Sequence, residues 1–371
     1  MPPFDLQLRP DICAASGRWI QHWRIMSWFT FNLQDFSISF LSILFEGVPF
    51  MFIGTLLSGF IDAFVPSEKM ERILPRNPVA AIALSGVLGV VFPMCECGVV
   101  PVIRRLIRKG LPVSCALTYL LAAPIVNPIV ALSTFAGFRG QHPTMVTSMR
   151  LIMGFGVALV CGMIVRRIPL NQMLNRSMIA SLRKRPALSS SRNRRVQEPV
   201  LAGAHAGATT ETNVVFPILP AEEIVHLHDE VHAEKHFGAK IVGAIRCAAF
   251  DFLDVGFYLI IGAAIASVFN TAVHREVLLP LAGNHLFATI AMMVLALLLS
   301  LCSTSDAFIA ANFLVFPVTA KLAFMVFGPM MDMKLLFMYG LVFKKRFTLS
   351  FAAGLFVFIG LLSLALIPFL R

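Results

Sequence analysis

Two cysteines flank a carboxylate inside an apolar stretch, in the string Cys95-Glu96-Cys97-Gly98. The surrounding segment, 78–103, is otherwise almost entirely apolar and is longer than the ~20 residues that one helical bilayer crossing needs. An ionisable side chain at membrane depth costs roughly 2.5–3.5 kcal/mol on insertion scales and is therefore rare without a purpose. Because thiols are soft ligands, this string favours the binding of a thiophilic metal or metalloid.

Glu96 admits a second interpretation, in which it pairs with a nearby cation such as Arg104 and the thiols only fill space. We favour ligand binding, because a carboxylate at this depth is costly under either interpretation. A later apolar segment is interrupted in the same way by the string CSTSD over 302–306, whose Asp could also cap the start of a helix. The residues of this second break that we expect to line a substrate site are Cys302, Ser303, Thr304 and Asp306.

Prolines mark two further breaks. In the string PIVNP over 124–128, two prolines four residues apart disfavour a continuous helix, and Asn127 offers donors and acceptors to the freed backbone. A kink without a function explains this string equally well. The counterpart, Gly328-Pro329 followed by Asp332, carries a charge, which favours function. We expect Asn127 and Asp332 to contribute to the substrate site.

The chain also contains an internal duplication. Glu46 precedes Gly54 by eight residues, as Asp254 precedes Gly262, and the offset between matching landmarks in the two halves stays at 205–208 residues. A proton-driven transport cycle needs a carboxylate that loads and releases a proton, and desolvation promotes this. Because Glu46 and Asp254 occupy matching positions, they are the predicted coupling-ion residues.

Composition places these motifs in a membrane. The chain is 57% hydrophobic and 14% charged, which is typical of a polytopic membrane protein. We predict an all-α transmembrane bundle of about eight (8–10) spans in two duplicated halves with broken helices, an arrangement typical of transporter sites near the bilayer midplane. The predicted spans are 40–64, 78–103, 111–138, 148–165, 247–269, 285–302, 307–327 and 348–370, and 335–343 is half of a broken helix.

The distribution of charge predicts which polar regions face the cytoplasm. The net charge is +11, and Arg166–Arg195 alone carries nine basic residues and no acidic one. Beside a membrane segment, such a block indicates the cytoplasmic face and favours anionic lipid headgroups rather than nucleic acid. We expect a multi-pass inner-membrane protein with a cytoplasmic N-terminal arm and a cytoplasmic, largely disordered loop. The predicted regions are the arm 1–38, a first repeat 39–166, the loop 167–240 and a second repeat 241–371.

The end of this loop is rich in histidine. Three of its histidines are spaced at i, i+4 and i+8, one face of a helix, which is a geometry that binds Zn(II), Ni(II) or Cu(II). A solvated acidic linker is the alternative. The candidate metal ligands are His226, His228, His232 and His236. We expect no cofactor, and the chain has no GxxxxGK[ST] phosphate loop, which argues against ATP hydrolysis.

Two long strings resemble the predicted permease family that includes the organoarsenical efflux permeases. They are CECGVVPVIRRLIRKGLPVSCALTYLLAAPIVNPIVALSTF at 95–135, and CSTSDAFIAANF followed by FGPMMDMKLL between 302 and 336. The resemblance implies an inner-membrane permease and, in the organoarsenical exporters, extrusion of trivalent arsenicals with membrane cysteines involved. It extends to Cys95, Cys97, Gly98, Pro101, Lys109, Gly110, Pro124, Asn127, Pro128, Cys302, Ser303, Thr304, Asp306, Pro329 and Asp332.

The sequence therefore predicts a transporter rather than an enzyme: a secondary active exporter of a soft metal, metalloid or organoarsenical through a Cys- and acid-lined site. A carboxylate at Glu96 would also suit a divalent cation. The alternatives are a membrane-embedded thiol- or metal-dependent enzyme and a permease of unrelated cargo. Cys-x-Cys is one residue tighter than the Cys-x-x-Cys redox spacing, and this break contains no histidine, which weighs against an enzyme.

Overall fold

The computed structural model describes most of the helical part of the 371-residue chain. The described residues are 33–64, 75, 77–92, 94–175, 178, 179, 182, 237–272 and 283–369. The four histidines proposed as metal ligands, His226, His228, His232 and His236, lie outside them, as do the first 32 residues. The described part is all-α, as predicted; its one bridge of β type joins Leu174 to Phe343.

Each half contains a long helix, two broken helix pairs and a second long helix, in that order. The first half consists of α2 (Leu33–Phe64), α4 (Pro78–Val91), α5 (Glu96–Arg108), α6 (Val113–Ala122), α7 (Pro128–Gly137) and α8 (Pro143–Val165), followed by the short α9 (Leu170–Met173). The second half consists of α12 (Phe237–Ala272), α13 (His285–Leu299), α14 (Ser305–Asn312), α15 (Val318–Met330), α16 (Met333–Tyr339) and α17 (Lys345–Ala365), with a final 3₁₀ turn at Ile367–Phe369. The repeated order agrees with the predicted duplication.

Three predicted spans are each divided between two helices. Segment 78–103 is α4 and α5, and segment 111–138 is α6 and α7, with the divisions at the breaks predicted at Cys95 and at 124–128. The third division was not predicted. Segment 307–327 joins α14 to the first part of α15 across a turn at 313–317. That turn has the apolar sequence FLVFP, so hydropathy gives no sign of it, and only Pro317 marks the start of the next helix.

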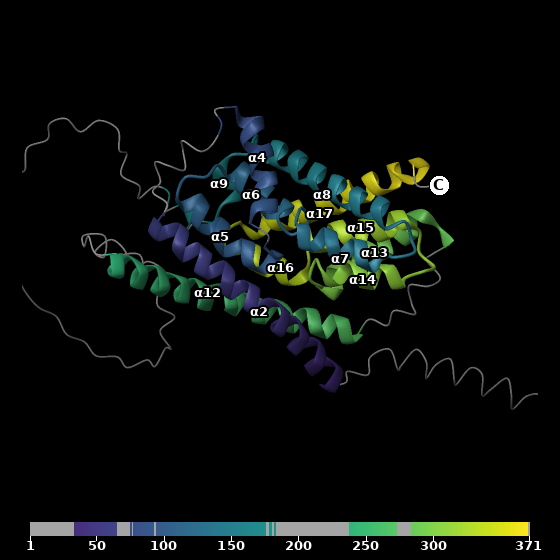
Figure 1. Cartoon of the computed structure of the whole chain (residues 1–371), viewed down its shortest axis with the longest axis horizontal. Helices are drawn as coiled ribbons and strands as arrows, with labels where there is room; N and C mark the ends of the chain where they lie inside the picture. Colours follow the sequence, from purple (N-terminus) through teal and green to yellow (C-terminus); the bar gives the residue numbers. More distant parts are fainter. Residues whose placement is uncertain are drawn as a thin grey trace, which may run out of the picture.

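Contacts between helix ends define two ends of the bundle. At one end, Lys344 before α17 bonds to the carbonyl of Asn171 in α9. We call it the basic end, because the cations beside the ends of α5 and α8 and the start of α17 gather there. At the opposite end, Gln141 in the α7–α8 turn bonds to the carbonyl of Ala311 in α14 and accepts from Lys321 in α15. In Figure 1 the basic end lies on the left and the opposite end on the right.

Close helix contacts show that α4 and α5 do not cross the bundle. Gly162, near the end of α8, lies against Ile82 near the start of α4, which therefore begins at the basic end. Gly89, near the end of α4, lies against the backbone of Ala123 at the break after α6. Helices α4 and α6 thus run side by side to the middle. Since α5 returns from there to the basic end, where Lys109 bonds to the end of α2, α4 and α5 form a re-entrant pair.

The second half repeats this arrangement from the opposite end. Gly328 of α15 lies beside Ala296 of α13, so these helices also run side by side towards the middle. Ser363, near the end of α17, donates to the carbonyl of Thr319 at the start of α15, which places both at the opposite end. Helices α13 and α14 are therefore the second re-entrant pair. With three crossing segments and one re-entrant pair in each half, the two halves have inverted orientations.

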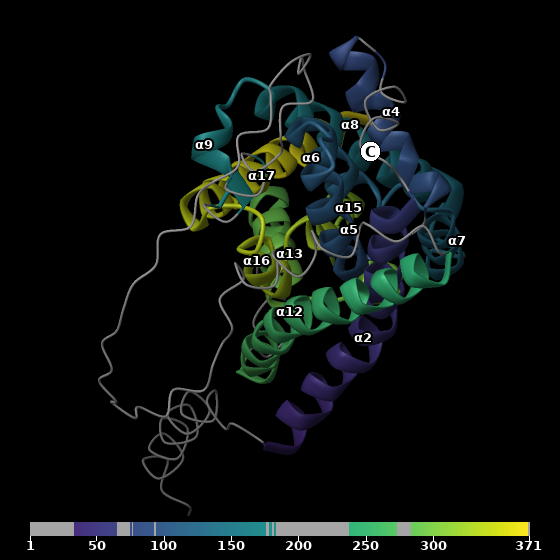
Figure 2. The ribbon, with the colours of Figure 1, turned by 90° about the vertical axis from the view of Figure 1, so that its left-hand side faces the viewer.

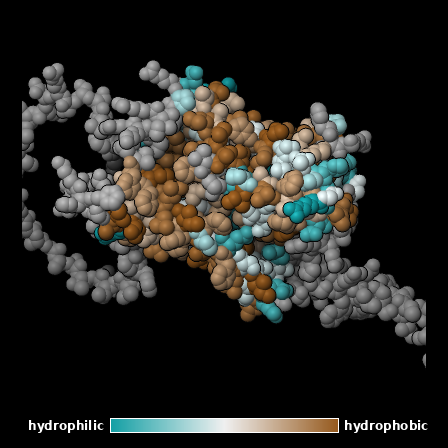
Figure 3. All heavy atoms as spheres, in the orientation of Figure 1, coloured by the Kyte–Doolittle hydropathy of each residue, from teal (hydrophilic) through white to brown (hydrophobic). Residues whose placement is uncertain are grey.

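The exterior of the bundle is apolar. The long helices expose large side chains such as Phe45, Ile152, Leu253 and Leu361, each more than half accessible. Figure 3 shows apolar residues over most of the visible face, with hydrophilic residues gathered mainly towards the right-hand end. Five segments are long and apolar enough to cross a bilayer: α2, α8, α12, Val318–Tyr339 and α17. The protein is therefore a multi-pass membrane protein.

The described helices do not support the prediction that the N-terminal arm and the long loop share a side. Asn270, near the end of α12, bonds to Ser39 near the start of α2, and the two helices run antiparallel. Helix α12 begins at the basic end and α2 begins at the opposite end (Figure 1). The arm itself lies outside the described residues.

Candidate functional site

Four helices begin near the middle of the bundle, each directly after a break. Two of them carry an acid in their first turn, Glu96 in α5 and Asp306 in α14. The other two are capped by side-chain oxygens, since Asn127 accepts from a backbone N–H of α7 at 2.9 Å and Asp332 accepts from one of α16 at 2.7 Å. Anionic and carbonyl oxygens are stabilised at these positive helix ends. The residues predicted from the breaks thus lie at helix starts.

A buried ion cluster connects two of these starts. Lys334 Nζ lies 3.0 Å from Glu96 Oε1 and 3.4 Å from Asp332 Oδ2, and it donates to the carbonyl of Ser300 at 3.0 Å. Glu96, Asp332 and Lys334 are 2%, 0% and 3% exposed. We call these three residues the central triad. It joins the first half, through α5, to the second half, through α16.

The central triad is not electrically balanced. Two carboxylates share one ammonium group, so the ionised triad carries a net charge of −1 at a buried position. Glu96 Oε2 has no hydrogen-bond partner, and Asp332 Oδ2 has none beyond its 3.4 Å ion pair with Lys334. An uncompensated buried charge is costly. A proton or a monovalent cation at either of these oxygens would make the triad neutral.

The predicted thiols of the first break lie beside this triad. The side chains of Cys95 and Cys97 are within hydrogen-bonding reach of each other, and both are buried. Cys97 Sγ faces α2 at Gly47, where a Cβ would lie 3.7 Å away. Pro101 has no N–H to donate to the carbonyl of Cys97, so this carbonyl lacks its usual helical partner. The Cys95 break thus presents two thiols beside a carbonyl that lacks its usual helical partner.

Cys302, in the break of the second half, also lies near the triad. Thr304 Oγ1 is 3.7 Å from its sulfur, and Cys302 and Cys97 are both close enough to Lys334 to interact with it electrostatically. Among the residues that the structure describes, no group of three or more His, Cys, Asp or Glu is arranged to hold a metal ion. The neighbouring pair Cys95 and Cys97 is therefore the best thiol site.

A second buried ion pair links the halves at Asp306. Arg150 Nη2 of α8 lies 2.8 Å from Asp306 Oδ2 and donates to the carbonyl of Ser303 at 3.0 Å, while Nη1 donates to Thr134 Oγ1 at 2.7 Å. Both charged residues are almost fully buried. In contrast to the central triad, this is one cation with one anion.

The predicted coupling residues have other contacts. Glu46 accepts a hydrogen bond from Ser305 Oγ at 2.7 Å, which joins α2 to the start of α14. Asp254 forms an ion pair with Arg104, and its side chain is 44% exposed. Neither carboxylate belongs to the central triad. The contacts also correct the alternative interpretation of Glu96, whose partner is Lys334 and not Arg104.

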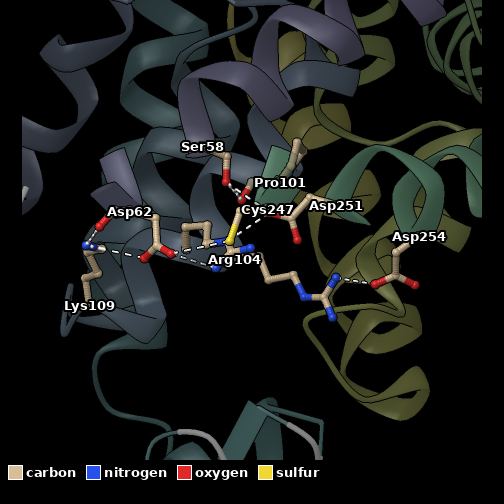
Figure 4. A network of polar contacts seen from close by, with 9 residues as sticks. Ser58, Asp62, Pro101, Arg104, Lys109, Cys247, Asp251 and Asp254 are labelled. Atoms are coloured by element: carbon tan, nitrogen blue, oxygen red, sulfur yellow. Dashed lines mark hydrogen bonds and ion pairs between the residues drawn. The ribbon is translucent and has the colours of Figure 1, made fainter. Parts of the chain in front are cut away.

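Towards the basic end, a further polar network holds α5 between α2 and α12 (Figure 4). Arg105 bonds to Asp251 at 2.8 Å and to Asp62 at 3.1 Å, and Lys109 lies 3.3 Å from Asp62. Ser58 donates to Asp251 at 3.3 Å. These contacts fix the far end of the helix whose start carries Glu96.

Sequence reasoning missed the two buried cations that pair with Glu96 and Asp306, which are Lys334 and Arg150. A signal was present for Arg150, because it lies inside the predicted span 148–165, where a cation is as costly as the carboxylate at Glu96. Lys334 gave a weaker signal, since it follows Asp332 by two residues and could equally belong to a polar turn.

A polytopic bundle with inverted halves, broken helices and a charged centre has the architecture of a membrane transporter. The chain belongs to a family described as predicted permeases, whose model matches residues 32–367. It is 36% identical over 310 residues to the protein YcgR of Bacillus subtilis, covering 83% of this chain and 88% of that protein. It is 31% identical over 313 residues, 84% and 88% of the two chains, to a Streptococcus mutans protein named as a candidate subunit of a two-component membrane permease complex. No solved structure matches the chain.

Proposed function

We propose that this permease is a secondary active exporter in which cargo and a coupling proton meet at the central triad. The observation that carries the proposal is the unbalanced charge of Glu96, Asp332 and Lys334 where broken helices of both halves meet. Inverted repeats with discontinuous helices bind substrate and coupling ion at such a place. The proton therefore belongs to Glu96 and Asp332 rather than to Glu46 and Asp254.

Protonation would change the charge of the centre. A proton on either carboxylate makes the triad neutral, and release of the proton restores a charge of −1. The two states differ in how they interact with the positive starts of α5 and α16, which belong to opposite halves. Proton loading thereby biases the relative position of the halves, and this bias is what couples transport to a gradient.

For the cargo, the neighbouring thiols favour a soft metalloid that needs only two sulfur ligands. A trivalent arsenical with one organic group has two exchangeable hydroxide ligands. When the thiols of Cys95 and Cys97 replace them, each thiol proton leaves with one hydroxide as water, and no net charge enters the site. Arsenite and antimonite have a third exchangeable ligand, which Cys302 would have to replace. We therefore propose a monosubstituted organoarsenical as the preferred cargo.

The positive-inside rule gives the proposed direction. The end that carries Lys109, Lys344, Lys345 and Arg346, and from which the 166–195 block follows, would face the cytoplasm. Cargo would then leave at the opposite end, across the inner membrane.

The test is uptake into inverted membrane vesicles with and without a proton gradient. The solutes are methylarsenite, arsenite, antimonite, Zn(II) and Cu(I). We expect methylarsenite to accumulate, and Cys95→Ser or Cys97→Ser to reduce the rate at least tenfold. Cys115→Ser is the matched control, because this cysteine is equally buried but lies on α6 beside Ser85 and Ser114. Glu96→Gln should leave binding of the arsenical intact and remove the dependence on the gradient.

The two parts of the proposal fail separately. If none of the five solutes accumulates, the soft-metalloid cargo is wrong. If methylarsenite accumulates equally with and without the gradient, the cargo stands and the coupling at the triad is wrong. Equal losses in the Cys97 and Cys115 variants would show that thiol substitution harms the fold rather than a site.

A further inference from the structure

A groove separates α8 from α17, the last helices of the two halves. At the basic end it opens into a cavity of about 750 Å³, within the usual size of a ligand pocket. Figure 2 looks onto this end and shows α9 beside the start of α17. The wall consists of the end of α8, α9 and the first part of α17, and it includes Val165, Asn171, Lys344, Arg346, Phe351 and Phe358.

The groove continues along the same two helices as a smaller cavity of about 290 Å³. Its lining is entirely apolar and runs from Met149 to Val160 on α8 and from Phe358 to Leu366 on α17. Phe358 lines both cavities, so they are adjacent. The space therefore runs from a polar mouth at the basic end to an apolar part that extends between α8 and α17 towards the opposite end.

A glycine keeps each part of the groove open. Gly354 lines the larger cavity and Gly156 lines the smaller one. A Cβ added at either residue would have no heavy atom within 4 Å. Many other helical glycines of this chain, such as Gly54, are instead packed tightly against a neighbouring backbone. These two glycines therefore leave space that no side chain of the described protein fills.

The mouth of the groove is positively charged. Lys344 and Arg346 line it, and Arg166 and Arg167 lie on the turn between Val165 and Ile168, two other lining residues. Among the residues that the structure describes, no acidic one lines either cavity. A ligand that complements this groove has an anionic head and an extended apolar tail.

We propose that the groove binds one anionic glycerophospholipid. Its phosphate lies at Lys344 and Arg346, and an acyl chain follows the seam past Gly354 towards Gly156. Basic pockets between membrane helices on the cytoplasmic side are suited to anionic headgroups. Because α8 and α17 belong to different halves, the lipid bridges the two inverted repeats and stabilises one of their relative positions.

The test is lipid binding to the purified full-length protein in a neutral detergent, measured by native mass spectrometry. Phosphatidylglycerol and phosphatidylcholine with the same acyl chains are the probes. We expect phosphatidylglycerol to be retained in preference, with one molecule bound most tightly. Each basic residue near an anionic headgroup changes affinity about fivefold, so the double variant K344Q/R346Q should bind it about 25-fold more weakly. K345Q is the matched control, because Lys345 is exposed on the same turn but does not line the cavity.

A second pair of variants tests the tail. G354F and G156F fill the groove without removing a charge, and both should reduce phosphatidylglycerol binding while the melting temperature stays within a few degrees. Equal retention of the two lipids would overturn the proposal, as would equal losses in K345Q and K344Q/R346Q. Displacement of the lipid by millimolar inorganic phosphate would show a site for the phosphate group alone. A dimer that G354F dissociates would show that a second copy of the chain occupies the groove.

Discussion

The two halves share one architecture and differ in their charges. Each has a re-entrant pair whose return helix starts with an acid, Glu96 in the first half and Asp306 in the second, and each acid pairs with a cation of the other half. Around Asp306, one arginine balances one carboxylate. Around Glu96, the lysine is shared with a second carboxylate, Asp332. The duplication thus repeated the scaffold, and the difference lies in the added side chains.

The helix caps show where this asymmetry arises. Asn127 and Asp332 occupy matching positions, and both accept a hydrogen bond from the start of the helix that follows. Asparagine does this without charge, whereas aspartate does it with a charge that faces Lys334. The cap charge is therefore one difference between the halves, and the cation is another, since Lys334 lies on α16 whereas Arg150 lies on α8. The comparison predicts that the two sites respond differently to mutation.

Removal of Lys334 or of Arg150 should have the largest effect on stability. Lys334→Met leaves two unpaired carboxylates and Arg150→Met leaves one, and loss of one partner of a buried ion pair costs about 3–5 kcal/mol. We expect both to lower the melting temperature in detergent, Lys334→Met by more. The double variants Lys334→Met/Glu96→Gln and Arg150→Met/Asp306→Asn are the controls. If Arg150→Met/Asp306→Asn regained most of the stability but Lys334→Met/Glu96→Gln did not, Asp332 would be confirmed as the extra charge. Equal recovery would contradict the asymmetry.

Substitution of the glycines that mark the duplication should have the next largest effect on stability. Alanine at Gly54 would place its Cβ 2.4 Å from the carbonyl oxygen of Gly98, and alanine at Gly262 would place it 2.7 Å from the Cα of Lys334. Because backbone must move in both cases, we expect each to cost about 1–3 kcal/mol. Gly256→Ala is the control, since its Cβ would only touch the flexible end of Met51 at 3.4 Å. Thermal unfolding would measure the three changes.

The two substitutions displace different parts of the candidate site. Gly262→Ala would displace the backbone of Lys334, whereas Gly54→Ala would displace Gly98 of α5, two residues after Glu96. If both variants unfolded at the same temperature as Gly256→Ala, the close approach of α2 and α12 to the broken helices would be wrong.

Among the ion pairs between helices discussed above, the pair of Asp254 and Arg104 should contribute least to the stability of the fold. Asp254 is 44% exposed, and pairs of this kind are worth about 0–1 kcal/mol. Asp251, by contrast, is 8% exposed and bonds to both Arg105 and Ser58. We therefore expect Asp254→Asn to leave the melting temperature nearly unchanged and Asp251→Asn to lower it clearly. The reverse order would show that α12 turns a different face to α5.

The sequence predicted the helical class, the broken helices and most of the residues around the centre, because prolines, glycines and buried charges all carry a local cost that is visible in the chain. It did not predict that Glu96 would meet Lys334, 238 positions away, because such a pair depends on how the halves pack. The sequence also did not predict that α4 and α5 form a re-entrant pair. Hydropathy detects an apolar run but not its direction, and inversion of the halves followed only from contacts such as Gly89 with Ala123.

The smallest effect on stability should come from the substitution that makes the two halves alike. Asp332→Asn keeps the cap oxygen that accepts from the backbone of Leu335 and removes the charge that unbalances the triad. Glu96 and Lys334 then form a one-to-one pair like Asp306 and Arg150. We expect the melting temperature to stay the same or to rise, although a buried carboxylate has been removed.

The same substitution should nevertheless abolish the response of transport to a proton gradient, because a proton would no longer neutralise an excess negative charge. Asp306→Asn is the matched variant. It leaves Arg150 buried without its anion, so it should lower the melting temperature by several degrees while the triad keeps its proton site. Stability and coupling would then respond in opposite ways at the two sites. If Asp332→Asn destabilised the protein as much as Asp306→Asn does, the central triad would be a structural ion cluster and the proton would have to bind elsewhere.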